Sequence, residues 1–302
     1  MTHHLTRRTL LSAAAALPLA HAAQASAPLL GASSALHRRF ILGNFEVTTL
    51  LAASATRDDP HSIFGLNVDE AAFRSAAEAA MLPVDQAQFF FTPTIVNTGA
   101  ELVLFDTGLN AAGITSALAA AGYTPDQVDV VVITHMHGDH IGGLREGDTS
   151  TFPNARYVTG AKEYDAWAGM ESDAFNGKMR PLADQTTMIM PGQTVAPGIT
   201  AMAAFGHTPG HMAYMIESEG VSLLLAADFA NHYVFSLGYP DWEVKFDMDK
   251  SAAAATRRSL LDMLAADRIP FIGYHMPFPA IGFVETRGEG FGYIPESYQL
   301  RL

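Results

Sequence analysis

The chain has 302 residues and 49% of them are hydrophobic, so it can bury a sizeable core in one large domain or two small ones. It contains no cysteine, which excludes disulfides, thiolate nucleophiles and Cys-ligated metals. The formal net charge of −13 disfavours a nucleic-acid partner, which needs a basic surface. We therefore expect a small neutral substrate.

The first 25 residues are typical of a targeting segment. Arg7 and Arg8 precede an apolar stretch over 10–20 that is too short to span a bilayer, and small residues follow it. The run from Thr6 to Leu11 resembles a twin-arginine signal, which predicts a periplasmic or secreted protein. An amphipathic N-terminal helix is the alternative interpretation. We expect residues 36–302 to form a single domain without a membrane span.

Strands and helices alternate in the rest of the chain. In the first half, strands are expected over 40–52, 88–96, 101–105, 128–133 and 155–159. Helices are expected between and after them over 68–81, 111–121 and 162–169. In the second half, strands are expected over 200–204, 212–217, 221–226 and 269–274. A long helix over 251–267 with Ser251 as N-cap precedes the last strand.

This order predicts the fold class. Strands come first as a meander and then mixed with helices, and the second half repeats the pattern. The prediction is an α/β (α+β) fold in the form of an αββα sandwich. Two mixed β-sheets pack face to face in such a fold, with helices on both outer faces.

The densest cluster of polar side chains directly follows the β-branched run over 128–133. Residues 134–143 read Thr-His-Met-His-Gly-Asp-His-Ile-Gly-Gly, which places four ligand-type side chains within six positions at a strand end: His135, His137, Asp139 and His140. Imidazole and carboxylate together suit zinc or a similar first-row ion. The spacing favours two ions over one. A polar turn with solvated histidines is the alternative interpretation.

Three further segments place a His or an Asp after an apolar strand. The run Gly206-His207-Thr208-Pro209-Gly210-His211 predicts a sharp turn, and one of its histidines could reach the site. Asp228 and His275 each follow a strand, although a turn Asp and a core His are ordinary alternatives. Because strand ends at one sheet edge converge, the four segments together predict seven ligands for two ions, with one carboxylate shared.

In this order, the motifs resemble those of the metallo-β-lactamase superfamily over nearly all of the mature chain. The resemblance implies the αββα sandwich and two divalent ions, with Zn²⁺ preferred over Mn²⁺, Co²⁺ or Fe²⁺. It assigns one ion to three histidines, namely His135, His137 and His207. It assigns the other ion to Asp139, His140 and His275, with Asp228 bridging the two.

Two more residues receive supporting roles from the resemblance. His211 matches a histidine that is not a ligand in the family. Asp106, in the strand-end run Asp106-Thr107-Gly108, matches an aspartate that orients a ligand histidine by hydrogen bonding. A turn aspartate is the alternative interpretation for Asp106.

The resemblance also narrows the choice within the superfamily. The runs over 275–282 and 288–295 are similar to methyl parathion hydrolase and its lactonase relatives. The lack of cysteine excludes the β-lactamases with a Cys ligand, and Asp228 speaks against the class that lacks this aspartate. Acyl-homoserine-lactone lactonases carry a carbonyl-polarising Tyr three positions after the bridging Asp. Asn231 stands there in this chain, which argues against specificity for quorum signals.

These residues predict a dinuclear hydrolase of neutral lactones or aryl esters, in which a hydroxide bridging the ions attacks the substrate. Asp139 and Asp228 are the predicted catalytic residues, and Asp139 carries the proton to the leaving group. An apolar substrate pocket is expected to include four side chains, for which core positions are the alternative: Phe91, Trp167, His232 and Phe278.

Other functions stay open at this point. The same ligand set suits an organophosphate (phosphotriester) hydrolase of the methyl parathion hydrolase type. A glyoxalase II-like thioesterase, a mononuclear iron dioxygenase and a binding protein without turnover are further alternatives. The resemblance and the insertion over 55–85 also favour a homodimer.

Overall fold

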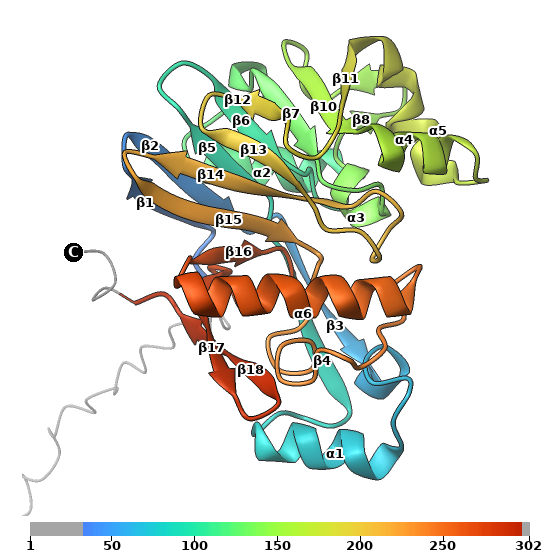
Figure 1. The fold of residues 1–302 in the computed structure, drawn as a ribbon. Coiled ribbons are helices and arrows are strands. Elements are labelled where there is room, and N and C mark those ends of the chain that lie inside the picture. The colour runs from blue at the N-terminus through green and yellow to red at the C-terminus, as the bar shows by residue number, and fades with distance from the viewer. Residues whose placement is uncertain (1–32, 298–302) are drawn as a thin grey trace, which may run out of the picture. The chain divides into compact units, whose positions relative to one another are not determined.

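The computed structural model describes residues 33–297, so the predicted signal peptide over 1–25 lies outside the described residues. The described residues from Ala35 onward form one compact unit. Two seven-stranded sheets dominate this unit (Figure 1). Across the first sheet the order is β1-β2-β5-β6-β7-β10-β11, and across the second it follows the sequence from β12 to β18.

The strands are short, as is usual for a sheet of this size. The first sheet contains β1 (His37–Leu42), β2 (Phe45–Leu50), β5 (Thr94–Asn97), β6 (Leu102–Phe105), β7 (Val130–Ile133), β10 (Arg156–Gly160) and β11 (Thr186–Ile189). The second contains β12 (Thr194–Ala196), β13 (Ile199–Ala203), β14 (Met212–Ser218), β15 (Val221–Ala227), β16 (Phe271–Gly273), β17 (Ile281–Arg287) and β18 (Gly290–Pro295). Two small ribbons pair β3 (Ala53–Asp58) with β4 (Gln86–Phe91) and β8 (Arg145–Glu146) with β9 (Thr149–Ser150).

Helices connect these strands. The α-helices are α1 (Glu70–Ala79), α2 (Ala111–Ala120), α3 (Gly138–Ile141), α4 (Ala161–Ala168), α5 (Asp173–Lys178) and α6 (Lys250–Asp267). Three 3₁₀ turns, η1 (Pro60–Ser62), η2 (Pro125–Gln127) and η3 (Arg180–Gln185), complete the elements. Among residues 33–297, none of the helices combines the length and the apolar character that a membrane span requires.

The alternation of side chains along β7 shows how the sheets and helices are layered. Val130 and Val132 lie in the core between the two sheets, whereas Val131 and Ile133 pack on the outer face with residues of α2. On the other side, α6 lies along the second sheet and contributes Leu261 to the core (Figure 1). The predicted αββα sandwich of two mixed sheets is therefore confirmed.

Several predicted elements differ in detail. The strand expected over 40–52 is the hairpin of β1 and β2, because Gly43 adopts φ 57° and turns the chain back at Asn44. The strand expected over 88–96 is interrupted between β4 and β5, where Pro93 has no N–H to donate. The N-cap of α6 is Asp249, whose carboxylate accepts from the backbone N–H of Ala252, and not Ser251.

Four strand ends define the edge that matters for function. The strands β6 and β7 are parallel neighbours in the first sheet, and β15 and β16 are parallel neighbours in the second. Their carboxyl ends lead directly into Asp106, Thr134, Asp228 and Tyr274. The topology therefore brings the candidate residues of all four turns to one edge of the sandwich.

Candidate metal centre

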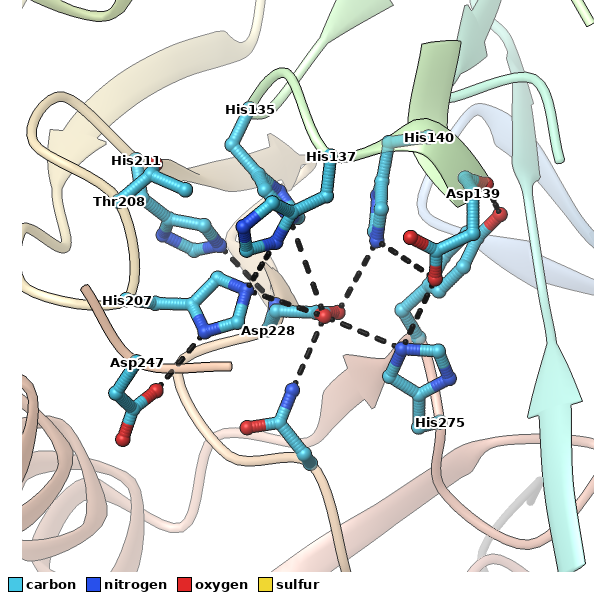
Figure 2. Close-up of polar contacts among 12 residues, drawn as sticks. His135, His137, Asp139, His140, His207, Thr208, His211, Asp228, Asp247 and His275 are labelled. Carbon is cyan, nitrogen blue, oxygen red and sulfur yellow. Dashed lines mark hydrogen bonds and ion pairs between the residues drawn. The ribbon is translucent and has the colours of Figure 1, made fainter. Parts of the chain in front are cut away.

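The seven predicted ligands converge at this edge (Figure 2). Three sets of side chains have ligand atoms within 4.8 Å of one another: His135, His137 and His207; His135, His140 and Asp228; Asp139, His140 and His275. Four of the seven follow β7 of the first sheet, and the other three follow β13, β15 and β16 of the second. The site therefore joins the two sheets.

The three-histidine set is compact. His137 Nδ1 lies 3.1 Å from His135 Nε2 and 3.0 Å from His207 Nε2. Two nitrogens that share a tetrahedral zinc ion, each about 2.0–2.1 Å from it, would be separated by about 3.4 Å. The observed separations are close to this value, so one cation can contact all three side chains.

Asp228 lies between the three-histidine set and the remaining ligands (Figure 2). Its Oδ2 is 3.5 Å from His207 Nε2 and 3.2 Å from His275 Nε2, and its Oδ1 is 3.5 Å from His140 Nε2. Asp139 Oδ2 is 3.3 Å from His275 Nε2 and 3.6 Å from His140 Nε2. One carboxylate therefore faces both halves of the site.

Two buried atoms test whether a cation fits. His140 Nε2 and Asp228 Oδ1 are both buried, and neither has a hydrogen-bond partner among the described residues. A buried polar atom without a partner is costly, and a cation between these two atoms would satisfy both. The His and Asp residues therefore fit a divalent metal ion.

The second ring nitrogen of most of these histidines is already bonded, which orients the free nitrogen toward the site. The Nδ1 partners are Thr134 Oγ1 for His135, Asp106 Oδ2 for His140, Asp247 Oδ1 for His207 and the carbonyl of Phe90 for His275, at 2.8–3.1 Å. His137 differs, because its Nδ1 faces the other ligands.

Burial lowers the pKa of some of these histidines, whereas nearby carboxylates raise the pKa of others. Burial lowers the pKa of His135 well below its usual value and that of His137 to about 3, so both are neutral and ready to bind a metal. At His275 burial also acts to lower the pKa, but Asp228 and Asp139 outweigh it and raise the pKa to about 10. The pKa of His140 is likewise raised, since Asp228 and Asp106 outweigh burial. Protons therefore compete with metal at His140 and His275.

The two supporting residues lie next to the site. Asp106 accepts hydrogen bonds from His140 Nδ1 and from the backbone N–H and hydroxyl of Thr134, at 2.8–2.9 Å. His211 donates through Nδ1 to the carbonyl of Ala204 and accepts through Nε2 from the backbone N–H of Asp228, both at 3.1 Å. Both nitrogens of His211 are therefore occupied, and it holds the backbone of Asp228.

The turn that carries His207 depends on two glycines. A Cβ at Gly206, where φ is 122°, would lie 2.2 Å from the backbone nitrogen of Ala253 in α6. A Cβ at Gly210 would lie 2.2 Å from the backbone nitrogen of Glu163 in α4. The predicted sharp turn is therefore present, and its glycines allow the turn to pack directly against two helices.

Glu163 is a supporting residue that the sequence did not reveal. Its fully buried carboxylate accepts four hydrogen bonds, from Met136 N, Trp167 Nε1, Thr208 Oγ1 and Gly210 N, at 2.6–2.9 Å. It thus links the loop of His135 and His137 to the turn of His207. In the sequence it reads as an ordinary first-turn Glu of a short helix, which is normally solvated.

Tyr274, Asp247 and Arg257 also escaped prediction. The ring of Tyr274 lies 3.9 Å from that of His140, and its hydroxyl donates to the carbonyl of Asp139 at 2.6 Å. Asp247 pairs with His207 over 40 positions of sequence and also accepts from the buried Arg257. A strand-end position could have drawn attention to Tyr274, but no local pattern marks Asp247 or Arg257.

A cavity of about 380 Å³ opens onto the ligands. Its floor includes His137, Asp139, Asp228 and His275, and its other lining residues are Arg57, Phe89, Phe91, Leu109, Gly138 and Phe246. Most of this wall is aromatic or aliphatic. The predicted pocket residue Phe91 lies here.

The other three predicted pocket residues do not line this cavity. The indole of Trp167 donates to Glu163 and packs edge-on against His137, with the ring centroids 5.7 Å apart. His232 lines a second cavity, about 390 Å³, that shares His275 with the first. Phe278 is half-buried between β16 and β17. The side chains that the cavity offers instead are Phe89, Leu109 and Phe246, which come from three separate segments.

Comparisons with known proteins identify the family and the fold. The family model for the metallo-beta-lactamase superfamily matches residues 92–270, more than half of the chain. The "N-acyl homoserine lactonase" of Bacillus thuringiensis is 32% identical over 117 residues, a match that covers 38% of this chain and only 44% of that relative.

Two solved structures share the fold. "AidC, a Dizinc Quorum-Quenching Lactonase" has a TM-score of 0.81 at 23% identity, and the match covers 88% of this chain and 99% of AidC. The "hydrolase AbOPH in beta lactamase superfamily" has a TM-score of 0.80 at 22% identity, with the same coverage of 88% and 99%. The fold and the converging His and Asp side chains are consistent with one family. Because the family model matches most of its strands and helices, the chain belongs to the metallo-β-lactamase superfamily.

Proposed function

We propose that the protein is a dinuclear metal-dependent hydrolase that acts on neutral lactones. The observation that carries this proposal is the position of Asp228. Its two carboxylate oxygens face His207 on one side and His140 on the other, at the floor of a largely apolar cavity. A shared carboxylate between two ligand sets is what a pair of cations needs.

Each half of the site has a defined task in this proposal. His135, His137 and His207 would hold one ion, Asp139, His140 and His275 would hold the other, and Asp228 would serve both. Divalent ions bound there would act as Lewis acids on the substrate oxygen and would lower the pKa of a bound water.

Asp139 is the proposed proton carrier. Its side chain is 23% exposed, where the side chains of Asp228 and His140 are 3% and 0% exposed, and it lines the cavity. Burial acts to raise its pKa, but His140 and His275 outweigh it and lower the pKa to about 2. The carboxylate is therefore ionised at neutral pH in the metal-free chain. Its place in the cavity lining is what supports the proposed transfer of a proton to the leaving alkoxide.

The cavity and the relatives together favour lactones with an apolar substituent. Phe89, Phe91 and Phe246 offer aromatic surface, which suits an uncharged ring or chain. One relative is an N-acyl homoserine lactonase and one structural neighbour is a quorum-quenching lactonase, which favours a lactone as substrate. Asn231 donates its amide to Asp228 Oδ2 at 3.0 Å, so this position offers no hydroxyl to a substrate carbonyl. We therefore place aryl lactones ahead of homoserine lactones.

The test is turnover by protein whose metal content has been measured. We expect two zinc, manganese or cobalt ions per chain, hydrolysis of aryl lactones, loss of activity with a chelator and recovery with zinc. The substitution Asp139→Asn should abolish turnover, whereas Asp148→Asn, at an exposed turn residue, should not.

Other outcomes would replace the proposal. Faster hydrolysis of paraoxon-like phosphotriesters or of thioesters than of any lactone would assign the site to one of those substrates. A single iron per chain, with no hydrolysis, would indicate the dioxygenase.

A further inference from the structure

The helix α6 carries a buried arginine, Arg257, that is linked to the metal centre through one intermediate residue, Asp247. Arg257 is fully buried, and its Nη2 donates to Asp247 Oδ2 at 2.6 Å. The other oxygen of Asp247 accepts from His207 Nδ1 at 2.9 Å. Asp247 itself is only 3% exposed. A buried carboxylate is therefore held between a guanidinium and a candidate metal ligand.

Arg257 also fixes the segment that contains Asp247. Its Nε donates to the carbonyl of Phe229, and its Nη1 donates to the carbonyls of Pro240 and Trp242, at 2.8–3.3 Å. Phe229 is the neighbour of Asp228. The one guanidinium therefore holds the chain next to Asp228 and, through Asp247, the ring of His207.

The backbone reinforces this arrangement. Met248 N donates to the carbonyl of His207, and Asp249 N donates to the carbonyl of Gly206, both at 2.9 Å. The residues that follow Asp247 are thus bonded directly to the turn that carries His207. The relative position of the carboxylate and the imidazole is fixed on both sides.

We propose that Asp247, held by Arg257, is a positioning residue that sets how tightly the three-histidine set holds its ion. A carboxylate that accepts the Nδ1 proton fixes the tautomer of His207, keeps Nε2 free and increases its basicity as a ligand. The inference rests on the metal binding in the proposed function but not on the choice of substrate.

The test measures zinc affinity directly. Zinc alone is titrated into metal-free, full-length protein in competition with a chromophoric chelator. In Asp247→Asn the neutral amide replaces the carboxylate, and its NH₂ or its oxygen must face Arg257. We expect one of the two sites to bind zinc about 10–100-fold more weakly and the other site to be unchanged. In the cobalt-substituted protein, the absorption bands of the ion at that site should also change.

A matched control comes from the same segment and helix. Asp241 pairs with Arg258, one position from Arg257, but this pair is exposed, with 68% of the Asp241 side chain accessible. Asp241→Asn should leave zinc affinity and the cobalt spectrum unchanged. Asp247→Glu keeps the charge but displaces the oxygens, so its zinc affinity should lie between those of wild type and Asp247→Asn.

The outcomes separate the two proposals. If wild type binds none of zinc, manganese and cobalt, the proposed function fails. The role of Asp247 is refuted if wild type binds two ions and Asp247→Asn binds both as tightly as wild type does. A lower melting temperature of the metal-free variant would not change that conclusion. If Asp247→Asn yields no folded protein, Asp247→Glu decides: weakened binding at one site supports the role, and unchanged binding overturns it.

Discussion

At the scale of single residues, the histidines of the metal centre differ in whether a metal must displace a proton in order to bind. His137 is neutral at pH 7 because burial lowers its pKa to about 3, whereas His275 is protonated because Asp228 and Asp139 outweigh burial and raise its pKa to about 10. Metal binding requires the neutral ring. The two halves of the site should therefore respond differently to pH.

This difference predicts proton release. Zinc titration of metal-free protein at pH 7.5, in two buffers of different ionisation enthalpy, should show about two protons released per chain from His140 and His275, and one more where a metal-bound water ionises. Because the raised pKa of His275 is about 10, zinc affinity should keep rising with pH between 6.5 and 10. His275→Ala should release about one proton fewer. Equal proton release by wild type and His275→Ala would contradict the assignment.

Glu163 gives a prediction about stability. In Glu163→Gln an NH₂ group takes the place of one oxygen, so at least one of its four buried donors loses its acceptor. We expect a loss of about 1–3 kcal/mol in the free energy of unfolding, measured by urea denaturation. The fluorescence of Trp167, whose indole N–H donates to Glu163, should also change.

The exposed residue Glu171 provides the control for this substitution. Glu171→Gln should change the free energy of unfolding by less than about 0.5 kcal/mol. If both variants unfold at the same urea concentration as wild type, the hydrogen bonds of Glu163 do not hold the two loops together.

Sequence motifs could reveal the seven ligand-type residues and the supports Asp106 and His211, but not the supports Asp247 and Glu163. The seven follow predicted strands, and the four segments together, rather than any one of them, make the pattern visible. Asp247 meets His207 from 40 positions away, and Glu163 meets Gly210 from 47 positions away. Their roles arise only when distant segments pack, and each by itself looks like an ordinary surface carboxylate.

At the scale of elements, the segment over 244–248 links the metal centre to the cavity mouth. Asp247 is bound to His207, and the preceding residue, Phe246, lines the cavity with 41% of its surface exposed. The segment is anchored by Lys245 N, which donates to the carbonyl of Ile63 at 2.8 Å. Phe246 is thus an exposed aromatic ring on a well-held segment, which suits contact with an apolar substrate.

This arrangement predicts a change in substrate binding. Phe246→Ala should raise KM about 5-fold for an aryl lactone and leave kcat almost unchanged, since about 1 kcal/mol of apolar contact is lost. A small lactone without an aryl group should be affected less. Steady-state kinetics on both substrates measure the effect.

Met248 is the matched control for Phe246. It is 46% exposed, two positions further on, and does not line the cavity. Met248→Ala should leave KM for both lactones unchanged. A similar rise in KM for the two variants would show that the segment, and not the Phe246 ring, determines binding.

The elements that the sequence did not predict were missed for different reasons. The hairpin of β1 and β2 depends on the conformation of Gly43, whose Gly-Asn pair was a detectable turn signal inside an otherwise continuous strand pattern. The hairpin of β17 and β18 forms the edge of the second sheet, and its residues alternate too weakly to stand out. Cavity-lining residues are harder still, because Phe89, Leu109 and Phe246 meet only in the folded chain.

At the scale of the whole molecule, the ligands come from both sheets. His135, His137, Asp139 and His140 follow β7 in the first sheet, whereas His207, Asp228 and His275 follow strands of the second. A metal that binds only the folded chain stabilises it by an amount that grows with the metal concentration, about 2.7 kcal/mol at 100 times Kd.

We therefore predict that chelation lowers the melting temperature. Removal of zinc from wild type should lower Tm by about 5–10 °C, as followed by circular dichroism. The variant Asp228→Ala, which lacks the shared carboxylate, should show a much smaller shift. Identical melting of wild type with and without zinc would indicate that metal does not join the sheets.

Export by the twin-arginine route, the homodimer and the similarity to methyl parathion hydrolase stay predictions from sequence. Each concerns the protein in its cellular setting or its exact substrate, which depend on features other than the fold.

The turn between β5 and β6 has a practical consequence. It lies at the end of β6 opposite Asp106, and a Cβ at Gly99 would meet no atom within 4 Å. Four residues of strand separate this turn from Asp106, or about 13 Å. A fluorophore or affinity tag inserted at residues 98–100 would thus track the enzyme in a mixture without disturbing catalysis.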